Sequence, residues 1–501
     1  MFINEMKKTL NEEYNYSISE NAALGYRTTG QALLDLNFKV ASLRKANANE
    51  IVDLFMKAFY EDKLLAVKWL FYARDAREGL GERRLFRVVA EYLCRNNPEV
   101  VKDLIQHIPE YGRYDDLLCV IGTQHTDIAI NIIKAQLKED EGNMAEGKPV
   151  SLLAKWLPSP NTSSKDTVAK AREIIKLLGM NEAQYRKMLS RLRKYIDVVE
   201  VKMSDKQWGE IIYEAVPSRA NLIYSDAFMR NDKDRRKEYL ASLARGETKI
   251  NASVLYPHDI VHNYCNDRGY GTTLKNLDVA LEELWKALPD TVNENGNTIV
   301  VADGSGSMMC GVGGTNVTAL SVANALAIYF AERSSGQFKD NYITFSSRPK
   351  LVDFRNCSSL REKIELALRH NEVANTNIEA VFDLVLSTAL KKKMQQSELP
   401  QNILIVSDME FNIAVTGRPD KRLFAVIADR YAQNGYKLPR LVFWNVNSRT
   451  GTIPMIENDL GVALVSGFSV NIAKMVLSGE LDPYKCLIDQ LMSERYARIT
   501  I

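Results

Sequence analysis

The sequence predicts two fold classes in succession, an all-helical array followed by a doubly wound α/β domain. In the first part of the chain, apolar residues recur at three- and four-residue spacing, the period of amphipathic helices. In the second part, short apolar runs alternate with helical stretches, which indicates a mostly parallel sheet covered on both faces. The polar stretch 290–297 separates the two patterns, so we expect one domain at residues 1–295 and another at 296–501.

Successive amphipathic segments make up the expected helical part. The first is anchored by Ile51, Phe55 and Phe59, whose four-residue spacing places them on one helix face. The polar stretch 138–149 is expected to form an exposed loop between two sets of helices. A compact bundle and a solenoid of stacked helical pairs both fit, because no repeat with a clean sequence period is present. Further helices are expected at residues 82–94, 127–137, 166–178, 182–198, 205–214 and 277–287.

Strands and helices alternate in the expected α/β domain. Ligands of such sheets bind beyond the carboxyl ends of the strands, so functional residues should follow the strands directly. Strands are expected at residues 298–302, 342–345, 351–354, 403–406, 441–446 and 462–465. Helices are expected at residues 317–332, 360–368, 378–390, 422–433 and 484–491.

The overall composition is that of a globular protein with little net charge. Of the 501 residues, 46% are hydrophobic and 26% are charged, and the formal net charge is +2. A whole-protein field that recruits nucleic acid or a membrane is therefore excluded, and such a partner requires a local patch. The cysteines form no Cys-x-x-Cys pair, which argues against a structural zinc site and against a disulfide framework.

The sequence also bears on the compartment. No apolar stretch reaches the roughly 20 residues that a membrane-spanning helix needs. The segment from Met1 to Lys8 lacks the apolar core of a signal peptide. We therefore expect a cytoplasmic protein with reduced thiols and no membrane partner. No pattern reports on assembly, and a monomer is the expectation.

A loop rich in oxygen-bearing side chains follows the first expected strand. The strand stops at Asp303, and Ser305 and Ser307 follow at alternating positions, separated by glycines that permit a sharp turn. Thr376 opens a later helical pattern, and Asp408 follows another buried strand. Oxygen ligands of low total charge suit Mg²⁺, or alternatively Mn²⁺ and Ca²⁺, rather than zinc or copper. These side chains therefore predict a site for one hard divalent cation.

A polar turn without a ligand is the alternative interpretation, in which Ser305 or Ser307 caps the next helix. Between the loop and that helix lies a glycine-rich insertion, residues 309–316. The insertion either gates access to the site or merely connects the two elements, and the sequence leaves both roles open.

The same five residues resemble the metal-ion-dependent adhesion site of von Willebrand factor A domains. The pattern of that site is Asp-x-Ser-x-Ser, followed by a distant Thr and a distant Asp. The resemblance implies that Ser305, Ser307 and Thr376 contact the metal directly, whereas Asp303 and Asp408 act directly or through water. It also implies that a water or a partner's carboxylate completes the coordination.

Four further segments carry a second resemblance: Asp75 to Phe86, Tyr111 to Leu117, Leu152 to Pro158, and Leu255 to Ile260. Together with the cation motif, they resemble the Ro ribonucleoproteins, in which a ring of HEAT-like helical repeats, the TROVE module, precedes a von Willebrand A domain. A related uncharacterised group has the same layout. The resemblance implies that residues 1–295 form a HEAT-like α-solenoid, a ring or an arc, that binds small structured or misfolded RNA.

A local basic segment offers a place for RNA in this nearly neutral chain. Between Lys170 and Lys194, eight residues are basic and two are acidic. Such clustered charge neutralises phosphates, and Tyr185 and Tyr195 lie close enough in sequence to offer stacking surfaces. A solvated helix face is the alternative interpretation. The residues expected to contact RNA are Lys170, Arg172, Arg186, Lys187, Arg191, Arg193 and Lys194.

Catalysis has little support in the sequence. No phosphate-binding loop of the Gly-x-x-x-x-Gly-Lys type is present, and no base or nucleophile is evident beside Asp303 and Asp408. We therefore expect a non-enzymatic RNA-binding protein whose Mg²⁺-bearing domain contacts the RNA or a protein partner. The alternatives are a protein-binding scaffold in which the metal captures a partner's carboxylate, and a metal-dependent nuclease.

Overall fold

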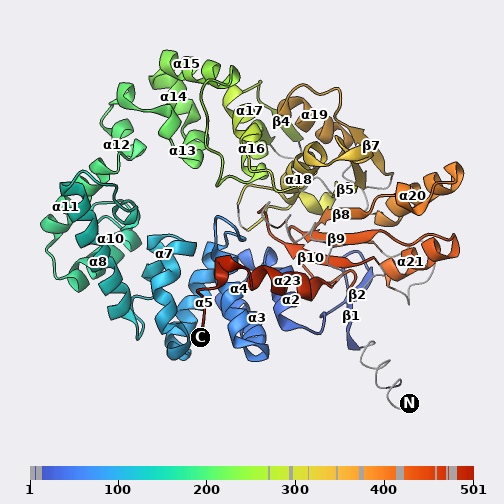
Figure 1. Cartoon of the computed structure of the whole chain (residues 1–501), viewed down its shortest axis with the longest axis horizontal. Helices are drawn as coiled ribbons and strands as arrows, with labels where there is room; N and C mark the ends of the chain where they lie inside the picture. The colour runs from blue at the N-terminus through green and yellow to red at the C-terminus, as the bar shows by residue number, and fades with distance from the viewer. Residues whose placement is uncertain are drawn as a thin grey trace. The chain divides into compact units, whose positions relative to one another are not determined.

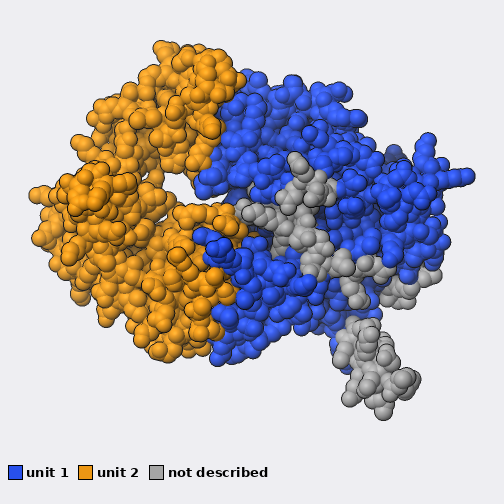
Figure 2. Space-filling model, viewed as in Figure 1, with its two compact units in different colours: residues 1–66, 252–495 blue, residues 67–251, 496–501 orange. Residues whose placement is uncertain are grey.

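The computed structural model divides into two compact units (Figures 1 and 2). Unit 1 contains residues 1–66 and 252–495, and unit 2 contains residues 67–251 and 496–501. This division differs from the predicted boundary between residues 295 and 296, because two segments on the N-terminal side of that boundary belong to the unit that contains the sheet. The structure describes Met6, Ile472 and residues 14–268, 271–292, 297–313, 315–345, 348–371, 377–412, 422–456, 460–469 and 482–501.

A six-stranded sheet forms the centre of unit 1. Its strand order is β10-β9-β8-β5-β6-β7, in which β6 and β7 pair antiparallel and the other neighbours pair parallel. The central strands are buried along nearly their whole length, which explains their continuous apolar sequences. All the strands expected from the sequence are present: β5 (Thr298–Asp303), β6 (Asn341–Phe345), β7 (Lys350–Asp353), β8 (Asn402–Ser407), β9 (Arg440–Asn445) and β10 (Val462–Ser466).

Helices cover both faces of this sheet. The crossover helices are α18 (Ala319–Arg333), between β5 and β6, and α21 (Leu423–Gln433), between β8 and β9. Parallel crossovers are right-handed, and these two run in opposite directions along the sheet, so the two helices lie on opposite faces. Unit 1 also contains α16 (Pro257–Tyr264), β3 (Cys265–Arg268), β4 (Gly271–Leu274), α17 (Val279–Lys286), η6 (Gly306–Met309), η7 (Gly336–Phe338), α19 (Leu360–His370), α20 (Ile378–Lys392), η8 (Gln396–Glu398) and α23 (Pro483–Leu491).

The N-terminal segment packs against the carboxyl ends of two strands. The Asn445 side chain at the end of β9 donates to the Phe38 carbonyl at 2.9 Å, and the Ser466 hydroxyl at the end of β10 accepts from the Ala41 amide at 3.0 Å. These contacts occupy the polar ends of β9 and β10. The segment consists of β1 (Tyr16–Ile18), β2 (Leu24–Tyr26), α2 (Ala32–Lys39), η1 (Ser42–Arg44) and α3 (Ala48–Glu61).

Unit 2 is built from helices. α10 and α11 each bury one apolar face, and both pack against α8. Across the described residues of both units, no helix combines the length and the apolar character that crossing a membrane requires. The elements of unit 2 are α4 (Lys63–Arg74, which begins in unit 1), α5 (Arg83–Asn96), α6 (Pro98–Val101), η2 (Lys102–His107), α7 (Ile108–Tyr111), η3 (Tyr114–Cys119), α8 (Thr126–Ala145), α9 (Leu153–Trp156), α10 (Lys165–Leu178), α11 (Glu182–Tyr195), α12 (Val199–Ser204), η4 (Trp208–Glu210), η5 (Tyr213–Ala215), α13 (Ser218–Ile223), α14 (Ser225–Asn231), α15 (Lys233–Ala244) and η10 (Glu494–Tyr496, shared with unit 1).

Two sequence-based expectations for unit 2 are wrong. α8 continues through most of the expected loop 138–149, because buried Asp140 accepts from the backbone amide and the hydroxyl of Ser151 at 2.8 and 2.7 Å. The helix then ends before Gly147, whose φ of 72° is the left-handed conformation typical of a helix C-terminus. The expected helix 205–214 is replaced by the short turns η4 and η5.

Candidate metal centre

Two carboxylates follow the adjacent strands β5 and β8. Asp303 is the last residue of β5, and Asp408 follows β8 directly. The strand register pairs Ala302 with Val406, which places Asp303 beside Ser407, and the Ser407 hydroxyl donates to Asp303 Oδ2 at 2.6 Å. The strand order reverses between β5 and β8, and doubly wound sheets bind their ligands at such a position.

The loop after β5 brings its two serine hydroxyls to the carboxylates. The Ser305 amide donates to Asp303 Oδ1 at 2.9 Å, which folds the loop back over the end of the strand. The hydroxyl oxygens of Ser305 and Ser307 are 3.0 Å apart, and the Ser307 hydroxyl forms a hydrogen bond with the Asp408 carboxylate. The structure thus brings together four of the five predicted ligands. The fifth, Thr376, lies outside the described residues.

The capping alternative for the two serines is wrong. α18 begins at Ala319, and its N-cap is Thr318, whose hydroxyl accepts from the Ser321 amide at 3.1 Å. Ser305 precedes η6 but its side chain makes no capping bond there. The hydroxyl of Ser305 therefore serves the carboxylate site and not a helix end.

The insertion after this loop forms a closed turn in its described residues. The Val312 amide donates to the Val317 carbonyl at 2.8 Å, and the Val312 side chain is buried. A Cβ on Gly311 would lie 2.7 Å from the Thr315 carbonyl oxygen, so the turn needs glycine at this position. These contacts support the connecting role of the insertion.

The two carboxylates are buried, and their negative charges are only partly balanced by neighbouring groups. Asp303 and Asp408 are each 0% exposed. Burial, followed by the charge of Asp408, raises the pKa of Asp303 to about 7. Burial also raises the pKa of Asp408, although Ser307, the Glu410 amide and Arg449 act in the opposite direction. A bound cation would remove this penalty, because it would favour the charged form of both groups.

The donor set at this position fits a hard cation. Carboxylate and hydroxyl oxygens are the ligands that Mg²⁺ and Ca²⁺ prefer, and both ions keep water in their coordination shells. In the part of the chain that the structure describes, no group of three or more His, Cys, Asp or Glu side chains is arranged to hold a metal. A cation here therefore depends on the serine hydroxyls and on water in addition to the two aspartates.

Arg449 brings one positive charge to the rim of the site, and no spacing in the sequence indicates it. Its Nη2 lies 3.3 Å from Asp408 Oδ2 and also pairs with the Glu20 carboxylate. Its Nη1 lies 3.7 Å from the Sγ of Cys310, in the insertion. The Arg449 side chain is 34% exposed, so solvent and partners reach the same guanidinium that pairs with Asp408.

Glu410 holds the loop that carries Arg449. Its buried Oε1 accepts from the backbone amides of Arg449 and Thr450 at 2.8 and 2.9 Å. Its Oε2 accepts from the Glu20 amide at 2.7 Å, and its carbonyl accepts from the Asn21 side chain at 2.6 Å. One buried carboxylate thus ties the β1–β2 hairpin and the loop after β9 to the end of β8. The N-terminal hairpin is therefore part of the candidate site.

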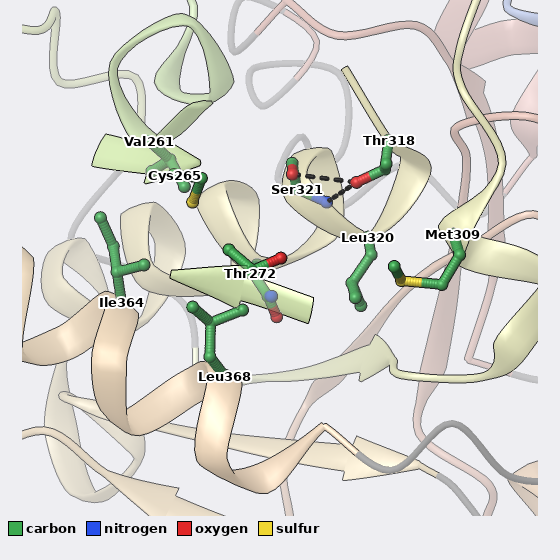
Figure 3. A pocket seen from close by; sticks show the side chains of 10 residues that line it. Val261, Cys265, Thr272, Met309, Thr318, Leu320, Ser321, Ile364 and Leu368 are labelled. Atoms are coloured by element: carbon green, nitrogen blue, oxygen red, sulfur yellow. Dashed lines mark hydrogen bonds between the residues drawn. The ribbon is translucent and has the colours of Figure 1, made fainter. Parts of the chain in front are cut away.

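A small cavity lies beside the same loop (Figure 3). Met309 of the loop lines it, together with Val261 of α16, Leu320 of α18 and Ile364 of α19. Neither Asp303 nor Asp408 lines this cavity, and most of its labelled side chains are apolar. The cavity is therefore separate from the cation site.

The predicted RNA-binding residues lie on α10 and α11 of unit 2. Arg191 is exposed but pairs with Glu141 at 2.7 Å, and Tyr195 is 37% exposed. The neighbouring cations leave much of this surface positively charged. Five of the predicted residues are exposed and make no ion pair within the described chain: Lys170, Arg172, Arg186, Lys187 and Lys194.

Arg193 and Tyr185 serve the packing of unit 2, contrary to expectation. The Arg193 guanidinium donates to the carbonyls of Ala154 and Leu157, each at 2.8 Å, and burial lowers the pKa of Arg193. Tyr185 is fully buried, and its hydroxyl donates to the Pro158 carbonyl at 2.9 Å. Both side chains therefore hold α9 and the segment after it against α11.

Comparisons with known proteins place two family models on the chain. Residues 297–493 match a domain of unknown function (DUF7788), and residues 19–110 and 176–298 match another domain of unknown function (DUF2828). The uncharacterized protein L728 of Acanthamoeba polyphaga mimivirus is 29% identical over 517 residues, which cover 95% of this chain and 87% of that protein. The crystal structure of the Deinococcus radiodurans Ro protein (RSR) is 15% identical, covers 90% of this chain and 92% of that chain, and has a TM-score of 0.34. The two family models together extend from the N-terminal hairpin to the α/β part of the chain, and they meet at residues 297–298.

Proposed function

We propose that this protein is a non-enzymatic RNA-binding protein whose second functional site holds a hard divalent cation, with Mg²⁺ as the preferred ion. In this proposal unit 2 is a HEAT-like helical array, and the sheet of unit 1 is a von Willebrand A-type domain. The order of its strands, with a reversal between β5 and β8, supports that assignment.

The observation that carries the RNA assignment is the set of unpaired cations on α10 and α11. Lys187 and Lys194 lie seven residues apart and therefore share one face of α11, opposite buried Leu189. Exposed lysines on one helix face present positive charge to solvent, which attracts an anionic partner. A nucleic acid backbone provides a row of such anions, and its counterions are released on binding.

Charge reversal on the two helices tests the RNA assignment. We expect Lys170→Glu combined with Lys187→Glu to weaken binding of a fluorescent single-stranded RNA at least tenfold at about 0.1 M salt. The slope of log Kd against log salt should fall by roughly 0.7 for each phosphate that the variant no longer neutralises. The matched control is Lys233→Glu with Lys237→Glu on α15, an equal charge change where acidic and basic residues alternate. Equally weakened binding in both variants, or unchanged binding in both, would contradict the proposal.

In unit 1, we propose that Asp303, Ser305, Ser307, Thr376 and Asp408 hold the cation. The support is the buried carboxylate pair with raised pKa values beside serine hydroxyls. The cation compensates the buried charge and presents a position for an anionic oxygen of the RNA or of a protein partner. This second contact needs no reaction, which agrees with a binding role.

Thermal unfolding with and without Mg²⁺ tests the cation site. A ligand that binds only the folded state stabilises it by about 2.7 kcal/mol at one hundred times its Kd. We expect Mg²⁺ to raise the unfolding temperature of the wild type but not of Asp303→Ala. Asp353→Ala, which removes a partly exposed carboxylate of β7 in the same unit, is the control and should keep the response. The cation site is disproved if neither Mg²⁺, Mn²⁺ nor Ca²⁺ stabilises the wild type.

A further inference from the structure

The first turns of α5 carry an arginine cluster that neither the cation site nor the basic face of α10 and α11 uses. Arg83 and Arg87 are four residues apart and therefore lie on the same face of the helix. Arg113, just before η3, joins them, because Asp115 Oδ2 pairs with Arg87 at 2.7 Å and with Arg113 at 2.8 Å. The N-cap residue of α5 is Glu82, whose side chain makes no capping hydrogen bond, and the first turn of the helix contains no acidic residue.

The carboxylates near this cluster do not balance it. Asp116 is fully buried and pairs with both Arg74 and Arg87 at 2.6 Å. Asp115, the second carboxylate of the group, is shared between Arg87 and Arg113. The two aspartates can neutralise at most two of the four arginines in this group, which are Arg74, Arg83, Arg87 and Arg113.

Arg83 carries the excess charge. It is exposed and makes no ion pair with any residue that the structure describes. The surrounding chain removes part of the hydration of Arg83, and this desolvation, followed by repulsion from Arg113 and Arg87, lowers the pKa of Arg83. A guanidinium in this position is stabilised when an anion binds between it and its two neighbours.

Contacts within unit 2 connect this cluster with the basic helices. The Arg113 guanidinium lies 3.8 Å from the centre of the Trp156 ring, at the end of α9. α9 is held in turn by Arg193 of α11, through the Ala154 carbonyl. The arginines are therefore fixed on the same packed group of helices that carries Lys187 and Lys194, which favours a ligand with several phosphates over a single phosphorylated side chain.

We propose that Arg83, Arg87 and Arg113 form a binding site for one phosphate group of a single-stranded RNA. This inference rests on the proposed function and adds a site outside α10 and α11. Guanidinium groups hold phosphate oxygens through paired N–H donors, and the contacts to Asp115 and Trp156 fix the orientation of two of the three groups before RNA binds. The negative phosphate balances the positive charge of the arginines that the two aspartates leave uncompensated.

Arg83→Gln tests the site, and Arg95→Gln is its matched control. Both variants remove one exposed positive charge from α5, but Arg95 already pairs with Glu91 at 3.0 Å. We expect Arg83→Gln to weaken binding of a fluorescent oligouridylate about five- to tenfold at about 0.1 M salt and to lower the salt slope by roughly 0.7. Arg95→Gln should leave both quantities unchanged. Without RNA, the unfolding temperature of Arg83→Gln should equal or exceed that of the wild type, because a repulsion is removed.

The outcomes separate this site from the proposed function. RNA binding that is insensitive to Arg83→Gln but weakened by Lys170→Glu with Lys187→Glu overturns the arginine site alone. If the wild type binds no RNA, yet inorganic phosphate or a phosphoserine peptide stabilises it and fails to stabilise Arg83→Gln, the RNA assignment is overturned and the phosphate comes from another source. A wild type that responds to none of these probes overturns both.

Discussion

At the end of β8, the Asp408 carboxylate interacts with both the Ser307 hydroxyl and the Arg449 guanidinium. A guanidinium and a divalent cation compete for the same carboxylate oxygens, because each neutralises the same charge. Arg449 has a second partner in Glu20, so it would keep an ion pair if Asp408 bound the proposed cation. In the proposed metal-bound state, Arg449 would therefore pair with Glu20 alone.

Removing the Arg449 charge should strengthen cation binding. We expect Arg449→Gln to lower the Mg²⁺ concentration at half-saturation roughly two- to fivefold, which corresponds to an ion-pair coupling of about 0.5–1 kcal/mol. Mg²⁺ titrations followed by thermal unfolding measure this midpoint. Arg355→Gln, which breaks the exposed pair with Asp353, is the control. A higher midpoint for Arg449→Gln would mean that Arg449 supports the metal instead of competing with it.

Local sequence order predicts part of this site. Asp303 and Asp408 directly follow apolar strands, and the position of a residue after a parallel strand is enough to place it at the ligand-binding edge. The contribution of Glu410 and Arg449 depends on Glu20, a residue about four hundred positions away along the chain, with which both make contacts. No local pattern encodes such a pairing, so these two residues become evident only in the folded structure.

At the scale of the helix, the basic residues of α11 lie on two sides, one buried and one exposed, and the sequence does not distinguish them. Arg193 points to the buried side, where it donates to the carbonyls of Ala154 and Leu157 and to the Ser159 hydroxyl. Lys187 lies on the exposed side without an ion pair among the described residues. The basic count between residues 170 and 194 therefore overstates the charge available to RNA.

Alanine substitutions on α11 should reveal this difference as stability. Arg193→Ala leaves the carbonyls of Ala154 in α9 and of Leu157 after it without this donor, and we expect it to lower the free energy of unfolding by about 2–3 kcal/mol. Lys187→Ala should change it by less than about 0.5 kcal/mol, as is usual for exposed positions. Urea denaturation measures both values. Similar stabilities for the two variants would show that the Arg193 contacts contribute little.

Strands were easier to predict than helix ends because their signal is local. Each strand of the central sheet is a short apolar run, and burial on both faces requires nothing more. The extension of α8 depends on the contact between Asp140 and Ser151, eleven residues apart, which converts an apparently polar loop into helix. Tertiary contacts of this kind override local propensity.

At the scale of the whole molecule, unit 1 is assembled from two distant stretches of chain. Leu36 and Phe38 of α2 are fully buried, and α2 packs against β10. Ile260 and Tyr264 of α16 are also fully buried, and α16 packs against α18. The predicted boundary at residue 296 assigns α2 and α16 to a different domain from the sheet, although both helices belong to unit 1. A change of hydrophobic period thus marks a change of secondary structure, not the edge of a compact unit.

A fragment of residues 296–501 should therefore be unstable. Burying four large apolar side chains contributes roughly 6–12 kcal/mol, which is comparable to the whole stability of a typical domain. We expect this fragment to bind a hydrophobic dye and to lose the cooperative, Mg²⁺-dependent unfolding of the full chain. Coexpression of residues 1–66 with 252–495 should abolish the dye binding and restore the cooperative, Mg²⁺-dependent unfolding. Cooperative unfolding of fragment 296–501 at the temperature of the full chain would contradict the expectation.

The division of the chain also has a consequence for biosynthesis. α2 is made early, but its partner β10 ends at Ser466, and unit 2 likewise waits for Tyr496, which stacks on Tyr111 at 5.6 Å and donates to Asp75 at 3.2 Å. Unit 1 is complete only when its last segment, which ends at residue 495, has been synthesised, and unit 2 only after Tyr496. During translation the apolar side of α2 therefore lacks its β10 partner until nearly the whole chain has been made, and it is a surface that a chaperone would need to shield.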